Sequence, residues 1–177
     1  MNKSLLEGFS IFADAGAEDM DAIAARCRVI EYAAGDQVFA QDSVAQGVYG
    51  VVDGGVELVL VLTEKVFSTT IEYEEALTVS HEVLEKPIVV ESLSAGDVFG
   101  WSSMVLPEGH WTAAARCTAP TRVFTVPADA LQALFEERPA LGYHFMRRLG
   151  GVISQRLQHR TAKLVDAWGE AFGGQMI

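Results

Sequence analysis

The chain has 177 residues, of which 50% are hydrophobic and 21% are charged, a composition sufficient for one domain with a well-packed core. The formal net charge is −11 at pH 7, which argues against nucleic acid as a partner, because proteins that bind phosphate backbones usually carry a basic surface. The N-terminal apolar run is too interrupted for a signal peptide and no stretch approaches the about 20 apolar residues that span a membrane, so we expect a cytoplasmic protein without a membrane partner.

The first predicted element is a short helix over residues 17–27, with Met20, Ile23 and Cys27 on one face. From Val29 onward, short apolar runs alternate with glycine turns, a pattern typical of a β-sandwich or barrel. These runs are RVIEY, AAGDQVFA, GVYGVV, VELVLVL, IVVESL, SAGDVFG and TRVFTV. The tripeptide Asp53-Gly54-Gly55, which separates the third run from the fourth, predicts a β-hairpin turn.

A short internal repeat supports a β-roll. The phrase AGDQVF at residues 34–39 returns as AGDVF at residues 95–99. Each copy places a Gly-Asp turn before a Val-Phe pair, with Gln37 between them in the first copy, so we expect two similar turns that each open a strand.

Residues 63–87 form an unusual segment between two of the apolar runs. Phe67, Thr69, Ile71 and Tyr73 alternate with other residues, which favours a strand. Residues 74–86 fit a strand or a helix, because their apolar positions also have helical spacing. We favour a long hairpin extension, which is either a contact surface for a partner or an ordinary variable loop.

Two helices are predicted at the C-terminal end. Residues 128–137 place Leu131, Leu134 and Phe135 on one side, and Pro139 opens a longer helix that runs to residue 172. The longer helix carries an apolar seam of Leu141, Phe145, Leu149, Val152, Ile153, Leu157, Leu164 and Trp168. This seam packs either on the chain's own barrel or on a second copy in a homodimer. The Gly150-Gly151 pair indicates close packing or a bend, and residues 173–177 are predicted to be a flexible tail.

This order of elements resembles the cyclic-nucleotide-binding domain, the sensor half of Crp/Fnr-type transcription factors. The resemblance covers roughly residues 5–165 and is most specific in segments 34–58, 93–100 and 122–149. It implies a mainly β fold: a jelly-roll-like, double-stranded β-helix with an N-terminal helix over residues 1–138, then a long helix over 139–172. Because the chain ends at Ile177, we expect no DNA-reading helix-turn-helix and a stand-alone module.

The resemblance also assigns a phosphate-binding loop, but without its charges. In the family this loop begins Phe-Gly-Glu, the glutamate accepts from the ribose, and an arginine near the loop's end neutralises the phosphate before a small hydroxyl residue. Phe99-Gly100 match, but Trp101 stands at the glutamate position and Trp111 at the arginine position, followed by Thr112. We therefore expect no binding of cAMP or cGMP in the family's usual way.

The candidate ligand-binding residues are Phe99, Gly100, Trp101, Ser102, Ser103, Trp111, Thr112 and Ala113. Their amides and hydroxyls could still hold an anion weakly, and the two indoles are large enough to fill the cavity. Arg160 and Thr161 on the long helix are candidate lid residues. Arg160 or Lys163 either stands in as a cation at the pocket or is a solvated helix charge.

No enzymatic site is predicted. His81, His110, His144 and His159 form no His-x-His pair, and no nucleophile–base pair is apparent, so we expect no catalytic residue, metal or cofactor. Cys27 and Cys117 are expected to be buried thiols. The predicted function is a regulatory module that acts through protein–protein contacts with an unknown partner and dimerises through the long helix. The alternative is a nucleotide sensor with a tryptophan-lined pocket.

Overall fold

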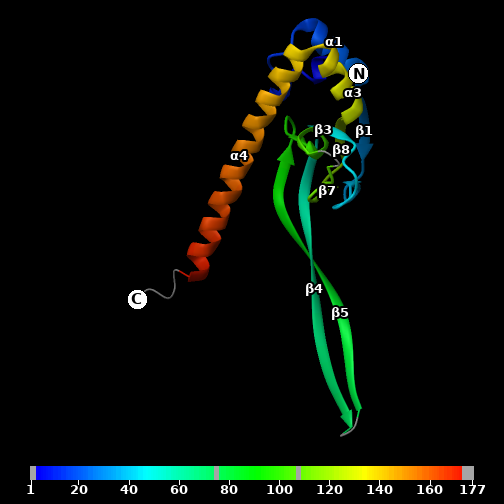
Figure 1. Cartoon of the computed structure of the whole chain (residues 1–177), viewed down its shortest axis with the longest axis vertical. Helices are drawn as coiled ribbons and strands as arrows, with labels where there is room; N and C mark the ends of the chain where they lie inside the picture. Colours follow the sequence, from blue (N-terminus) through cyan, green and yellow to red (C-terminus); the bar gives the residue numbers. More distant parts are fainter. Residues whose placement is uncertain (1–2, 74–75, 107–108, 173–177) are drawn as a thin grey trace.

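The computed structural model describes the backbone of residues 3–73, 76–106 and 109–172. It describes the side chains of the same residues except those of 64–84 and 171–172. Its strands are β1 Arg28–Tyr32, β2 Gln37–Phe39, β3 Gly47–Asp53, β4 Gly55–Tyr73, β5 Ala76–Ser94, β6 Val98–Phe99, β7 Ala114–Cys117 and β8 Thr121–Pro127. Its helices are the short 3-10 turns η1 Lys3–Leu5 and η2 Ser10–Phe12, then α1 Ala17–Arg26, α2 Ser102–Val105, α3 Ala128–Glu137 and α4 Pro139–Phe172. Two four-stranded antiparallel sheets, ordered β1-β8-β3-β6 and β2-β7-β4-β5, form a β-roll (Figure 1). The predicted fold class is confirmed.

The two Gly-Asp turns have the same local geometry. Gly35 and Gly96 both have positive φ values, 88° and 94°, which favour glycine. In each turn the aspartate side chain accepts a backbone N–H three residues earlier: Asp36 Oδ2 from Ala33 at 2.7 Å, and Asp97 Oδ2 from Ser94 at 2.8 Å. The repeated phrase therefore predicted two equivalent turns correctly.

The hairpin predicted at Asp53-Gly54-Gly55 is wrong. β3 pairs with β8 and β6, whereas β4 pairs with β7 and β5, so the chain passes from one sheet to the other at this turn. The glycines are needed because the turn packs against the β7–β8 connection. A Cβ on Gly54, whose φ is 90°, would lie 2.6 Å from the Pro120 carbonyl oxygen, and Gly55 N–H donates to Thr121 Oγ1 at 3.2 Å. The Gly-Gly pair thus marks a close backbone approach between sheets.

The segment at 63–87 is a hairpin extension, as predicted. β4 and β5 pair continuously from Gly55↔Ser94 to Tyr73↔Ala76, so the helical alternative for residues 76–86 does not occur. Strand β7 pairs with β4 over residues 56–59. Beyond residue 59, β4 and β5 continue as a two-stranded arm that projects from the β-roll (Figure 1).

The core has two parts. One lies inside the β-roll and contains Phe39, Tyr49, Phe99 and Trp111. The other joins the roll to the helices, and it contains residues of η2, α1, β8, α3 and the first half of α4, among them Phe12, Ile23, Phe124, Leu131 and Phe145. The sequence-predicted apolar faces of α1 and α3 pack in this second part, where Leu131 and Leu134 are buried and Phe135 is partly buried.

Helix α4 is continuous through Gly150-Gly151 and leads away from the other helices along the β-roll (Figure 1). Arg148 donates two hydrogen bonds to the Asp14 carboxylate, at 2.6 and 2.7 Å, and so ties the first half of α4 to the N-terminal segment. No helix among the described residues is both long and apolar enough to cross a membrane. The tail predicted at residues 173–177 lies outside the described residues.

Candidate ligand-binding site

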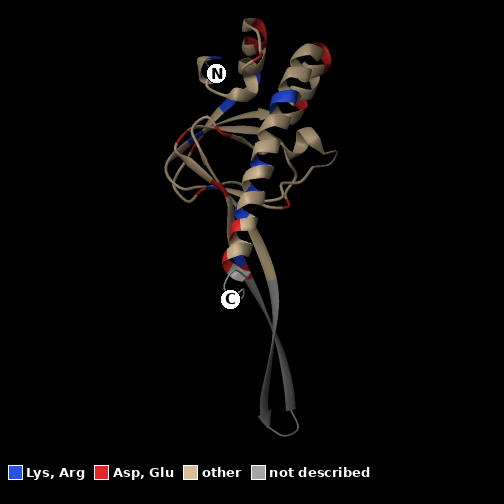
Figure 2. Cartoon of the chain, turned by 90° about the vertical axis from the view of Figure 1, so that its left-hand side faces the viewer, with Lys and Arg blue, Asp and Glu red and all other residues tan. Residues whose placement is uncertain are grey.

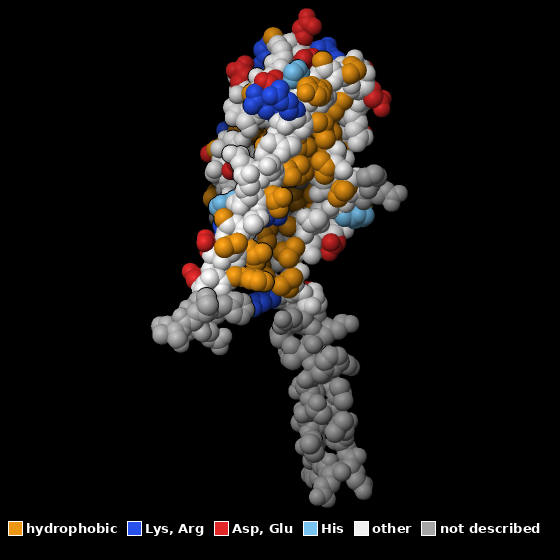
Figure 3. All heavy atoms as spheres, turned by 60° about the vertical axis from the view of Figure 1, so that its left-hand side comes forward, with side chains coloured by type: hydrophobic (Ala, Val, Ile, Leu, Met, Phe, Trp, Pro, Cys, Tyr) orange, Lys and Arg blue, Asp and Glu red, His pale blue; other side chains and the backbone are white. Residues whose placement is uncertain are grey.

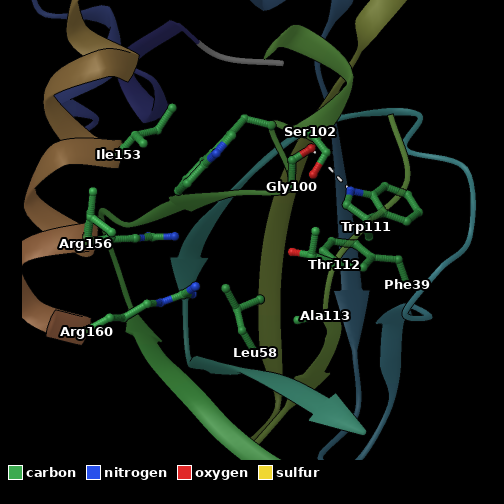
Figure 4. Close-up of a pocket in the computed structure, with 12 residues that line it drawn as sticks. Phe39, Leu58, Gly100, Ser102, Trp111, Thr112, Ala113, Ile153, Arg156 and Arg160 are labelled. Carbon is green, nitrogen blue, oxygen red and sulfur yellow. Dashed lines mark hydrogen bonds between the residues drawn. The ribbon is translucent and has the colours of Figure 1, made fainter. Parts of the chain in front are cut away.

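A cavity of about 260 Å³ lies between the β-roll and α4 (Figure 4). Strands β2 and β4, the loop around α2 and the segment before β7 form one side, and α4 forms the other. The lining residues are Phe39, Leu58, Gly100, Trp101, Ser102, Trp111, Thr112, Ala113, Ile153, Arg156, Leu157 and Arg160. All the charged side chains that line this cavity among the described residues come from α4.

The loop side begins at Gly100, where the backbone has a φ of 74°. A Cβ at this position would lie 2.7 Å from Tyr49 Cδ2 in the core, so the loop approaches the β-roll too closely for a larger residue. The chain then turns through Trp101 into the short helix α2. Glycine at this position therefore brings the Trp101 and Ser102 side chains to the cavity.

Trp111 is fixed in the wall of the cavity. It is 5% exposed and stacks on Phe39 with a centroid distance of 4.0 Å and an interplanar angle of 12°. Its Nε1–H donates to the Gly100 carbonyl oxygen at 3.3 Å, the dashed line in Figure 4. The indole N–H is thus already used within the protein. Together the two indoles line the cavity without filling it.

Trp101 contacts a cation from the other side. The Arg156 guanidinium lies over the Trp101 ring, 4.6 Å from its centroid, in a cation–π contact. Arg156 Nη2 donates to the Val98 carbonyl oxygen at 2.6 Å, whereas Nη1 is buried without a hydrogen-bond partner among the described residues. Burial lowers the pKa of Arg156, opposed by the nearby Glu91 and Asp97 carboxylates. The group stays protonated, because guanidinium pKa values begin so high.

Arg160 lies one helical turn further along α4. Its Nε is 3.5 Å from Glu91 Oε2 on β5, and the Arg160 side chain is 44% exposed while that of Glu91 is 12% exposed. Figure 4 shows both arginines pointing from α4 toward the loop and strands. The cavity therefore combines aromatic and aliphatic walls with two guanidinium groups and the side chains of Ser102 and Thr112. Such a surface can hold an oxyanion attached to an apolar body.

Most of the sequence-predicted residues meet at this cavity, and three do not. Phe99 is fully buried in the core, where it stacks against Tyr49. Ser103 borders a separate hollow together with Gln132. The Thr161 hydroxyl donates to the Leu157 carbonyl oxygen within α4. Neither Ser103 nor Thr161 lines the cavity, because α2 and α4 carry them to other faces.

Sequence reasoning missed Arg156. A usable signal was present, since Arg156 precedes Arg160 by four residues and follows Ile153 by three, which places all three on one helical face. Phe39 and Leu58 were missed because nothing local distinguishes a strand residue that lines a cavity from one that fills the core. Among the described residues, no three His, Cys, Asp or Glu side chains are placed to hold a metal ion.

Comparison with known proteins is consistent with this geometry. A family model described as the cyclic nucleotide-binding domain matches residues 29–138. No curated protein matches the chain in sequence. A structure from Geobacter metallireducens described as a cyclic nucleotide-binding protein is 24% identical, with a TM-score of 0.67, and the match covers 89% of this chain and 98% of that one.

Two further solved structures share the fold at lower identity. A cyclic nucleotide-binding domain from Methylobacillus flagellatus is 16% identical, with a TM-score of 0.71 over 93% of this chain and 84% of that one. The sensor domain of the transcriptional regulator DNR from Pseudomonas aeruginosa is 17% identical, with a TM-score of 0.59 over 88% and 91%. These likenesses extend beyond the matched segment into α4 and support the fold of nearly the whole chain.

Proposed function

Because the chain belongs to the cyclic nucleotide-binding domain family, we propose that it is a non-enzymatic regulatory module whose pocket does not bind cAMP or cGMP in the family's usual way. The observation that carries this proposal is Trp111. It occupies the position where the resemblance places the phosphate-binding arginine, and its N–H donates to the Gly100 carbonyl. Trp101, at the position of the ribose-binding glutamate, contributes no carboxylate either.

The energetic consequence is large. Truncating one partner of a buried charge pair costs about 2–5 kcal/mol, and about 1.4 kcal/mol corresponds to a tenfold change in dissociation constant. Loss of both charged anchors is therefore expected to weaken a micromolar cyclic nucleotide to roughly millimolar or beyond.

Isothermal titration calorimetry tests this proposal. We expect cAMP, cGMP and a cyclic dinucleotide to bind with dissociation constants no lower than about 1 mM. A constant below about 10 μM for any of them would contradict the proposal. The same samples must show cooperative thermal unfolding, so that the absence of heat reports the pocket and not unfolded protein.

A homodimer through α4 is part of the proposal. The second half of α4 carries exposed apolar side chains: Leu157 at 65%, Leu164 at 58%, Val165 at 63% and Trp168 at 64%. Figure 3 shows apolar side chains gathered in a stripe along this part of the molecule. Leu157, Leu164 and Trp168 are spaced by seven and four residues, and the polar Thr161 occupies the intervening position of the coiled-coil pattern of four, three and four. A second copy of α4 is the occupant that this spacing fits best.

The same seam extends backwards through small residues. Counting by the same spacing from Leu157 leads to Ser154 and Gly150, and a Cβ added to Gly150 would meet nothing within 4 Å. A small residue with open space beside it lets a partner helix approach closely. We therefore infer that the first half of the predicted seam packs against the β-roll and that the second half packs against a partner copy.

The second candidate function is a sensor with a modified pocket. It is favoured by the cavity itself, which the two tryptophans leave open and which has cations on its α4 side.

A further inference from the structure

We propose that the cavity binds a small organic monoanion with an apolar body, and that Arg156 and Arg160 of α4 hold its oxyanion group in place of a loop arginine. The inference rests on the proposed function in that it uses the same cavity. It differs in naming the ligand's charge class and the residues that read it.

The cations have a distinct origin. No arginine or lysine occurs between Gly96 and Ala115, so the loop supplies no positive charge. Helix α4 carries five of the 13 Lys and Arg residues of the chain but two of its 24 Asp and Glu residues. Basic positions recur along α4 in Figure 2. In an acidic chain, α4 is therefore a locally cationic element, and two of its arginines border the cavity.

The unused donor of Arg156 points to a ligand. Nη2 and the ring contact with Trp101 fix the guanidinium, while Nη1 is buried without a hydrogen-bond partner among the described residues. Buried donors are rarely left unpaired in proteins, and a guanidinium fork fits a carboxylate or phosphate oxygen well. Nη1 is closed off from solvent, so an oxyanion in the cavity would supply the missing acceptor after a small rotation of the Arg156 side chain.

The charge balance selects a monoanion. The described residues that line the cavity include two arginines and no carboxylate. Glu91 is the carboxylate in contact with Arg160, at 3.5 Å, and its Oε2 is likewise buried without a hydrogen bond. Asp97 also acts on Arg156, but its carboxylate accepts from the backbone N–H and hydroxyl of Ser94. Glu91 and Asp97 each offset part of the charge of the two arginines, so the site favours no more than one negative charge on a ligand.

The apolar walls limit the size of the rest of the ligand. Leu58, Trp111, Ala113 and Ile153 border the cavity. Its volume, about 260 Å³, lies at or below the lower end of the range typical of small-molecule sites, roughly 300–1,000 Å³. A carboxylate on one or two rings, or on a short alkyl chain, suits this combination of size and polarity.

Calorimetry with matched ligand pairs tests the proposal. The probes are 2-naphthoate and 4-phenylbutyrate, each against its neutral amide, with cAMP as a phosphodiester monoanion. We expect at least one carboxylate to bind about tenfold or more tightly than its amide. Equal binding of acid and amide, or no binding of either carboxylate up to about 5 mM, would overturn the proposal.

Variants locate the binding. Arg156→Gln is expected to weaken the carboxylate about tenfold or more and Arg160→Gln somewhat less, because Arg160 is partly exposed and shared with Glu91. Lys163→Gln removes the same charge from an exposed position of α4 and should change the affinity less than about twofold. If Arg156→Gln unfolds the protein, Arg156→Lys serves in its place, because it removes the guanidinium but keeps the charge. Carboxylate binding that is unaffected by the variants of both arginines would refute the assignment.

Glu91→Gln is expected to increase the affinity for the carboxylate, a change that partial unfolding of the variant would not produce. Removing the carboxylate that competes for Arg160 should tighten carboxylate binding by about threefold or more. Unchanged or weaker binding would count against the charge balance. Tight, Arg156-dependent binding of cAMP would refute the proposed function and leave this inference standing. If no anion binds, this inference is refuted and the proposed function stands.

Discussion

The two halves of α4 have similar apolar content and opposite environments. In the first half, Leu141, Phe145 and Leu149 are 4%, 1% and 0% exposed, and they complete the core between the β-roll and the helices. In the second half, Leu157 and Leu164 are 65% and 58% exposed. An apolar seam in a sequence therefore identifies a face that needs cover, but it does not say whether the chain itself or another molecule provides that cover.

The largest contrast should come from identical substitutions in the two halves. Leu149→Ala removes a fully buried side chain and should lower the free energy of unfolding by about 2–5 kcal/mol. Leu164→Ala, measured at a protein concentration where the chain is monomeric, should change it by less than about 0.5 kcal/mol, because the side chain is mostly solvated. Urea unfolding measures both values. Equal losses would mean that the second half is covered within the monomer.

The next prediction concerns the partner copy. Leu164→Asp places a charge in the middle of the seam, and in a two-fold dimer it does so twice, so the dimer dissociation constant should rise by about 100-fold or more. His159→Asp, on the side of α4 away from the seam, is the matched control and should leave it nearly unchanged. Sedimentation equilibrium measures both. A wild-type chain that is monomeric at every accessible concentration would remove the basis of the dimer proposal.

The sequence predicted the fold well because its turn chemistry is local. Gly35 and Gly96 could be recognised as equivalent turns from five neighbouring letters, and the aspartates that follow them make the expected hydrogen bonds. The hairpin at Gly54-Gly55 was misjudged because its glycines serve a contact with Pro120 and Thr121, which no local pattern reveals.

The site residues likewise divide into those that local sequence predicts and those that it does not. The loop residues from Gly100 to Ser102, and Trp111 with Thr112, could be placed because they adjoin a recognisable phrase. Arg156 could not, because its role depends on how α4 crosses the β-roll. That crossing is fixed by the buried first half of α4, far from the loop in sequence.

The last pair of predictions uses one substitution, glycine to alanine, at two positions of α4 that differ in their surroundings. A Cβ at Gly151 would meet nothing within 4 Å, so Gly151→Ala should raise the free energy of unfolding by about 0.5–1 kcal/mol through its better helix propensity. A Cβ at Gly142 would lie 2.9 Å from Phe135 Cβ on α3, so Gly142→Ala should lower it by about 1–3 kcal/mol through overpacking. Thermal or urea unfolding measures the sign of the change in the free energy of unfolding for each variant. Stabilisation at both positions would show that α4 can move away from α3 at little cost, and that the first half is less tightly fixed than its burial implies.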